Sequence, residues 1–161
     1  MLNEELLTDI LKDEIKFPLD LYSFKLVRKS SHFLIEIALD NLENRFGSVS
    51  LSDCEVLSKK LTVRLDELYP EENYTIQISS AGAERQLRLP KDLYRFKDLP
   101  MKMFFLDSTG VSRSGIFNIL HLDEKEIEIQ TFLGKKKSAK KGEVFKLQIS
   151  DIQKGNLYME F

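Results

Sequence analysis

The sequence predicts an α+β protein in which an N-terminal α-β-β-α-β domain precedes a small C-terminal β-barrel. The 161 residues are 42% hydrophobic and 31% charged, which is enough apolar material for a packed core. The hydrophobic spacing changes along the chain, from mixed helical and alternating patterns in the first half to short strand patterns in the second. Charge divides the chain in the same region, because residues 1–88 hold 11 basic and 16 acidic residues (net −5), whereas residues 89–161 hold 13 and 10 (net +3).

The first domain is predicted from five elements in order. Apolar residues at every third or fourth position indicate an amphipathic helix over residues 2–15. Alternating apolar residues over 22–26 and 33–39 indicate a β-hairpin. Hydroxyl caps and a second helical repeat predict a helix over residues 50–69, and alternation over 74–78 adds a third strand.

The second domain follows a stretch of small and polar residues that cannot supply a core. We place the boundary after residue 86, so that the domains are residues 1–86 and 87–161. A short helical stretch ends near Phe96. Five strands with turn signals between them then suggest a small β-barrel; they are predicted at 101–107, 115–122, 126–132, 143–149 and 156–161.

The cysteine content and the hydropathy predict a cytoplasmic protein that does not bind membranes. Cys54 is the single cysteine, so an intramolecular disulfide or a zinc site built on several thiolates is excluded. The N-terminus is acidic and is not expected to be a signal peptide. No run of about 18 apolar residues is present, so no spanning helix is expected.

The side chains that usually carry catalysis are scarce. His32 and His121 are the only histidines, and neither has a partner at metal-ligand spacing. Cys54 falls on the apolar stripe of the predicted second helix, where a core role is expected. We therefore expect no enzyme, no cofactor, no metal and no small-molecule substrate.

A run of lysines between two predicted strands is the candidate site for contact with RNA. Its members are Lys135, Lys136, Lys137, Lys140 and Lys141. Such a loop can reach the phosphates of RNA, and the alternative is a solvated hairpin tip. The neighbouring Phe132 and Phe145 fall in strand patterns and are expected in the barrel core, so no exposed aromatic platform for reading bases is predicted.

The segment between the two domains has two interpretations. Residues 79–87 could be a simple linker, or Glu84 and Arg85 could brace the domains against each other. The residues alone do not choose between them.

The same segment carries a family resemblance. Residues 74–87 read YTIQISSAGAERQL, in which Ser80, Gly82, Arg85 and Leu87 match the domain-junction signature of the bacterial ribosome maturation factor RimP family, with Glu84 in place of its acid. Residues 49–66 resemble the second helix of that family, and residues 115–120 and 152–157 follow its C-terminal pattern. Ala81 and Gln86 stand where the family usually has proline, which predicts a weaker constraint on the angle between the domains.

The resemblance implies an SH3-like barrel at the C-terminus and a non-enzymatic protein that binds the free small ribosomal subunit during assembly. It further implies contact with the twelfth ribosomal protein of that subunit, near the decoding centre, through the barrel. The lysine run would then bind ribosomal RNA phosphates, and the acidic N-terminal half would suit basic ribosomal proteins. The alternatives are a general RNA-binding barrel dimerised by its N-terminal domain and an enzyme with an active site between the domains.

Overall fold

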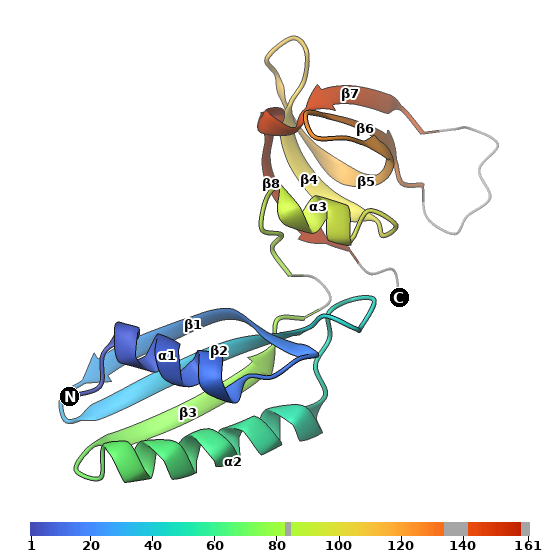
Figure 1. Cartoon of the computed structure of the whole chain (residues 1–161). Coiled ribbons are helices and arrows are strands. Elements are labelled where there is room, and N and C mark those ends of the chain that lie inside the picture. Colours follow the sequence, from blue (N-terminus) through green and yellow to red (C-terminus); the bar gives the residue numbers. More distant parts are fainter. Residues whose placement is uncertain (83–84, 134–141, 159–161) are drawn as a thin grey trace. The chain divides into compact units, whose positions relative to one another are not determined.

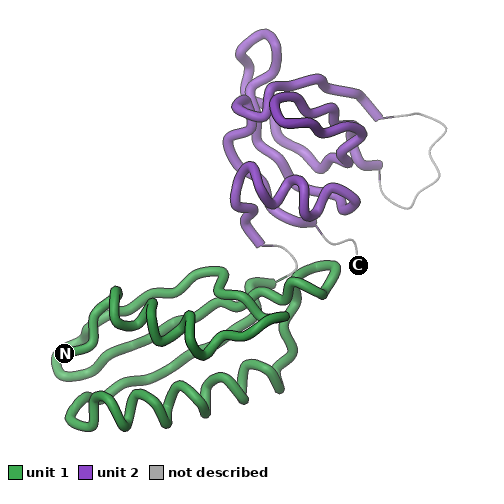
Figure 2. The backbone as a smooth tube through the Cα atoms, viewed as in Figure 1, with its two compact units in different colours: residues 1–82 green, residues 83–161 purple. Residues whose placement is uncertain are grey.

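The computed structural model (Figure 1) describes residues 1–82, 85–133 and 142–158. The chain forms two compact units, Met1–Gly82 and Ala83–Phe161 (Figure 2), which are called unit 1 and unit 2 below. The sequence placed the division after residue 86, and that boundary stays a prediction.

Unit 1 is a three-stranded sheet with two helices. Its elements are α1 (Glu4–Glu14), β1 (Leu19–Lys29), β2 (His32–Asn41), α2 (Leu51–Leu68) and β3 (Asn73–Ser80). The strand order is β1-β2-β3; β1 and β2 form an antiparallel hairpin, whereas β2 and β3 are parallel. A parallel neighbour requires a crossover connection, which α2 supplies (Figure 1).

Both helices of unit 1 begin at polar caps and bury one apolar stripe. The Asn3 side chain accepts a hydrogen bond from the Leu6 amide at 2.9 Å, and the Ser50 hydroxyl accepts one from the Asp53 amide at 3.1 Å. The two stripes share a single core with the inward-facing side chains of the sheet, so both helices cover the same sheet face. The buried members of the helices and β2 include Leu7, Ile10, Leu11, Ile35, Ile37, Leu39, Cys54, Leu57, Leu61 and Leu65.

Unit 2 is a five-stranded antiparallel sheet that follows a short helix. Its elements are α3 (Lys91–Arg95), β4 (Met101–Leu106), β5 (Ser112–Leu122), β6 (Glu126–Thr131), β7 (Val144–Gln148), the 3₁₀ turn η1 (Ile149–Asp151) and β8 (Ile152–Leu157). The strand order is β7-β6-β5-β4-β8. Met101, Met103 and Phe105 of β4 are buried, and the alternate residues Lys102 and Phe104 lie on the other face.

The predicted α+β class is confirmed, but the closure that a barrel requires is not. Within the described residues the strands of unit 2 pair as one open sheet with β7 and β8 at its edges. The last strand also begins earlier than the predicted residue 156. The Asp151 carboxylate accepts a hydrogen bond from the Gln148 amide at 3.1 Å and closes a tight turn, so that the chain re-enters the sheet at Ile152.

Candidate functional site

The lysine run predicted to contact RNA lies outside the described residues, as does Glu84. The residues on either side of the run are held by the sheet. The Phe132 amide donates to the Ile116 carbonyl at 2.8 Å, and the Thr131 amide donates to the Glu143 carbonyl at 2.9 Å. A role of the five lysines in RNA contact therefore stays a prediction.

Ser80 and Gly82 of the junction signature lie at the end of β3 and have structural roles inside unit 1. The Ser80 hydroxyl accepts hydrogen bonds from the amides of Val49 at 3.0 Å and Gly82 at 3.2 Å. It thereby fixes the loop that leads into α2 to the end of the sheet. Gly82 has a φ of +87°, a backbone conformation that side chains disfavour and glycine adopts freely. The two signature residues thus shape the exit of the chain from unit 1.

Arg85 and Leu87 of the same signature contact unit 2. The Leu157 amide donates to the Arg85 carbonyl at 2.9 Å, and the Leu87 amide donates to the Gly155 carbonyl at 2.7 Å. These two bonds flank a bridge between Gln86 and Asn156, so this segment lies antiparallel to the end of β8. The signature therefore spans the exit from one unit and the entry into the other.

The Arg85 side chain is buried in unit 2, with only 4% of it exposed. Its guanidinium carbon lies 5.4 Å from the centre of the Phe96 ring, where the positive charge meets the negative face of the aromatic system. Close by along the chain, the buried carboxylate of Asp92 accepts a hydrogen bond from the Arg88 amide at 2.8 Å and pairs with its guanidinium at 3.2 Å. Arg85 thus has contacts within unit 2, and its bracing of the two units stays a prediction.

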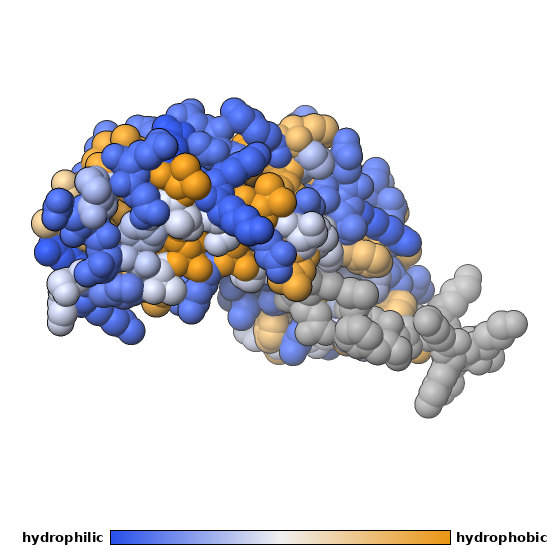
Figure 3. Space-filling model, turned by 90° about the horizontal axis from the view of Figure 1, so that it is seen from below, coloured by the Kyte–Doolittle hydropathy of each residue, from blue (hydrophilic) through white to orange (hydrophobic). Residues whose placement is uncertain are grey.

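The outer face of α2 carries apolar side chains that are not continuous. Seen from below, the surface of unit 1 has small apolar groups separated by hydrophilic residues (Figure 3). The exposed apolar residues that α2 contributes are Leu51, Val56, Val63 and Leu68. Isolated exposed apolar side chains are normal on soluble proteins, and they do not define a binding surface.

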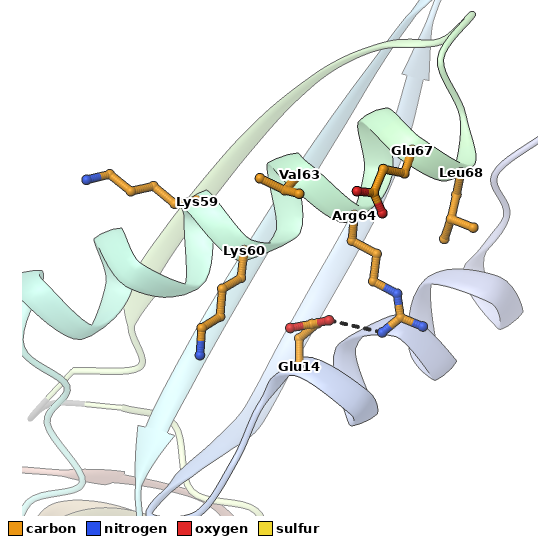
Figure 4. Close-up of a pocket in the computed structure, with 7 residues that line it drawn as sticks. All are labelled: Glu14, Lys59, Lys60, Val63, Arg64, Glu67 and Leu68. Carbon is orange, nitrogen blue, oxygen red and sulfur yellow. Dashed lines mark hydrogen bonds and ion pairs between the residues drawn. The ribbon is translucent and has the colours of Figure 1, made fainter.

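A shallow groove of about 600 Å³ lies beside the contact between α1 and α2 (Figure 4). Arg64 of α2 reaches across to α1, where its guanidinium pairs with Asp13 at 3.0 Å and with Glu14 at 3.1 Å. The hydrogen bonds to these two carboxylates raise the pKa of Arg64. The arginine therefore links the two helices, and its charge is already neutralised within the groove.

The two histidines contact polar side chains of the fold, and the cysteine is buried in the core of unit 1. The His32 imidazole is hydrogen-bonded to the Thr75 hydroxyl at 2.7 Å, and His121 lies 3.5 Å from Asp123. Cys54 is buried, and desolvation, with Asp53 and Glu55 nearby, raises the pKa of its thiol. In the described ranges no three potential metal ligands lie together, and no helix there is long and apolar enough to cross a membrane.

One cluster in unit 2 was not anticipated from the sequence. Lys102 and Phe104 of β4 share the outer face of the sheet with Lys154 of β8, and both ammonium groups lie near the ring of Phe104. These three residues border a cavity of about 430 Å³, which is completed by Ile116, Asn156, Leu157 and Tyr158. The alternation in Met101-Lys102-Met103-Phe104 could have indicated that Lys102 and Phe104 share the outer face of the strand. It could not have indicated that Lys154 lies near them, because Lys154 is distant in sequence.

The two phenylalanines beside the lysine run differ in their surroundings. Phe145 makes edge-to-face contacts with Phe105 and Phe117 at centroid distances of 5.3 and 5.9 Å, as expected of a core residue. Phe132 instead forms an edge-to-face pair with Tyr158 at 6.1 Å, next to the cavity.

Comparison with known proteins shows relatives that match both units of this chain. Residues 13–84 match the RimP N-terminal domain family. A protein of Leptospira interrogans serogroup Icterohaemorrhagiae serovar copenhageni, named "Ribosome maturation factor RimP", is 41% identical over 158 residues, which is 98% of this chain and 97% of the relative. A protein of the same name from Leptospira biflexa serovar Patoc is 36% identical over 157 residues, with the same shares of each chain.

These matches confirm the resemblance that residues 49–66 and 74–87 carry. They extend beyond the N-terminal domain family and include unit 2. The chain belongs to the ribosome maturation factor RimP family.

Proposed function

We propose that this protein is a cytoplasmic ribosome maturation factor, which binds the free small ribosomal subunit and assists its assembly without catalysing a reaction. The observation that carries the proposal is the 41% identity to a protein named ribosome maturation factor over 98% of this chain. Because the match includes both units, the function of the whole relative is the natural one to propose for the whole chain.

The proposed partners are the ribosomal RNA of the small subunit and its twelfth ribosomal protein, near the decoding centre. Unit 2 would make the principal contacts, and the lysines at positions 135–137, 140 and 141 would bind RNA phosphates. The net charge of −5 over residues 1–88 makes unit 1 better suited to a basic ribosomal protein than to RNA.

Unit 2 is proposed to be an SH3-like barrel. What supports this is the antiparallel order β7-β6-β5-β4-β8, in which a single 3₁₀ turn joins the two edge strands. Bending the sheet until β7 approaches β8 would close such a barrel around the rings of Phe105, Phe117 and Phe145.

Co-sedimentation of the purified chain with free small subunits, large subunits and assembled ribosomes tests the function. Each mixture is run at low and at physiological salt, since contacts made only to phosphates weaken steeply as salt rises. Retention on free small subunits alone, at both salt concentrations, is the expected result. Equal binding to all three particles that is lost with salt would contradict the proposal and favour a general RNA-binding protein.

Reversing the charges of Lys135, Lys136 and Lys137 further distinguishes a maturation factor for the small subunit from a general RNA-binding protein. If binding combines protein and RNA contacts, the variant is expected to bind small subunits more weakly but detectably. If the chain is only a general RNA-binding module dimerised by unit 1, the variant loses binding, and the parent protein sediments as a dimer in analytical ultracentrifugation.

A further inference from the structure

The outer face of the unit 2 sheet brings two lysines and an aromatic ring together from separate strands. Lys102 and Phe104 are two residues apart on β4 and therefore point to the same side. Lys154 of β8 is the cross-strand partner of Phe104, and Asn156 is that of Lys102. We call the set formed by Lys102, Phe104, Ile116, Lys154, Asn156 and Tyr158 the Phe104 surface.

Among the residues that the structure describes, no carboxylate neutralises the positive charge of the Phe104 surface. The ammonium nitrogen of Lys102 lies 5.5 Å from the centre of the Phe104 ring, and that of Lys154 lies 5.9 Å from it. Neither lysine forms an ion pair within the described part of the chain, and no acidic residue lines the cavity beside them. Two ammonium groups near the same ring repel each other, so an anion that binds to both of them is stabilised.

The shape of the surface favours a ligand with planar faces. The residues that border the cavity of about 430 Å³ include two aromatic residues, Phe104 and Tyr158, and the amide residue Asn156. Aromatic side chains provide stacking surfaces for unpaired bases, and a side-chain amide can both donate and accept hydrogen bonds at a base edge. A carboxylate-rich peptide would use the lysines but would have no need of the stacking surface.

We propose that the Phe104 surface binds single-stranded RNA, with a base stacked on Phe104 and the adjacent phosphates bound by Lys102 and Lys154. A base that stacks on the ring displaces an ammonium group from the ring face and frees it for a phosphate. The site lies on regular strands of the sheet, apart from the lysine run. It requires RNA binding by unit 2 but not a role in ribosome maturation, so it can fail or succeed independently of the proposed function.

Fluorescence anisotropy with a labelled ten-nucleotide oligouridine tests the site on the full-length chain. Phe104→Leu removes the stacking ring but keeps an apolar side chain, and it is expected to weaken binding about 5- to 150-fold, the range for loss of one base–aromatic stack. Lys102→Gln with Lys154→Gln is expected to reduce the slope of log affinity against log salt by about 1.4, as two single-strand phosphate contacts contribute.

A matched control keeps the same net charge as the double lysine variant. Lys125 and Lys146 are exposed lysines of unit 2 outside the Phe104 surface, and their replacement by glutamine removes two charges elsewhere in the unit. The proposal expects a smaller change in the salt slope for this control. Equal slopes for the two double variants, or unchanged affinity in Phe104→Leu, would overturn it.

Photocross-linking of the unaltered protein guards against variants that fold poorly. An oligouridine containing 4-thiouridine is irradiated in the complex, and tryptic peptides that carry the RNA are identified by mass spectrometry. Cross-links are expected in the peptides 103–113 and 155–161, which contain Phe104 and Tyr158. Cross-links confined to other peptides would overturn the site. So would variants that lose small-subunit binding but keep full RNA affinity, since the surface would then bind a protein.

Discussion

Replacement of Ser80 by alanine tests whether the junction signature stabilises unit 1 from within. The Ser80 hydroxyl is the acceptor for the Val49 amide at 3.0 Å and the Gly82 amide at 3.2 Å. Val49 is only 9% exposed, so its amide would be left buried without that acceptor. An unsatisfied buried donor costs about 1–3 kcal/mol, and we expect Ser80→Ala to destabilise the loop before α2 by about 2 kcal/mol.

Amide hydrogen exchange measured by NMR reports on this loop directly. A loss of about 2 kcal/mol corresponds to about 30-fold faster exchange of the Val49 amide, because about 1.4 kcal/mol is a factor of ten. Since Ser80 and the two amides that donate to it all belong to unit 1, amides of β6 in unit 2 are expected to keep their exchange rates. In a thermal scan of a unit of this size, the same energy lowers the midpoint by about 8–16 °C.

Two further variants control this experiment. Ser79→Ala alters the exposed neighbour of Ser80 and is expected to change stability by less than about 0.5 kcal/mol. Ser80→Thr retains the hydroxyl and is expected to preserve most of the protection at Val49. If Ser80→Ala exchanged at the parental rate, the hydroxyl would not be what holds the loop, and the structural account of this signature residue would be refuted.

Three other outcomes are expected. Leu61→Ala, at a core position that is 1% exposed, should lower the free energy of unfolding by about 2–5 kcal/mol in urea titrations, and a loss below about 1 kcal/mol would contradict the core assignment. Burial, together with a hydrogen bond to Asp66, raises the pKa of Tyr74 to about 12. The contribution of the neutral Tyr74 hydroxyl to stability should therefore be complete below pH ~10 and lost as pH rises towards 12. An absorbance titration of Tyr74→Phe should lack one late-titrating tyrosine. Hydrogen bonds from the Arg113 guanidinium and, to a smaller extent, from the Thr109 hydroxyl hold the pKa of Asp107 well below its usual value near 3.8. Asp107→Asn should therefore lower the urea midpoint at neutral pH, and the difference from the parent protein should shrink as pH falls below about 4. A difference that stays constant with pH would argue against the ion pair.

Local patterns in the sequence predicted the elements of unit 1 closely. The second helix was expected over residues 50–69 and spans Leu51–Leu68. Its start is a hydroxyl cap, and its buried face repeats every three or four residues; both signals lie within the helix itself. The family resemblance was visible for the same reason, since residues 74–87 are contiguous in the chain.

Features that depend on distant residues were not predicted. Barrel closure requires pairing between edge strands, and the described strands form an open sheet. The sequence showed that Ser80 belongs to the junction signature, but it did not predict the hydrogen bond between Ser80 and Val49. That bond joins residues 31 positions apart and exists because β3 lies parallel to β2. The sequence also predicted no exposed aromatic platform, because Phe132 and Phe145 fall in strand patterns. It did not predict that Lys154 lies near Phe104, since the two residues come from strands far apart in the chain.

Local signals in the chain were enough to predict the fold class, the helices, most strand positions and membership of the ribosome maturation factor RimP family. These depend on periodicity, caps and short motifs, which act over a few residues. The three-dimensional structure was needed to show that Ser80 and Gly82 shape unit 1, that Arg85 and Leu87 contact unit 2, and that two lysines lie near the Phe104 ring. Strand pairing brings together side chains that are far apart along the chain, and their hydrogen bonds and charge contacts exist only because of that pairing.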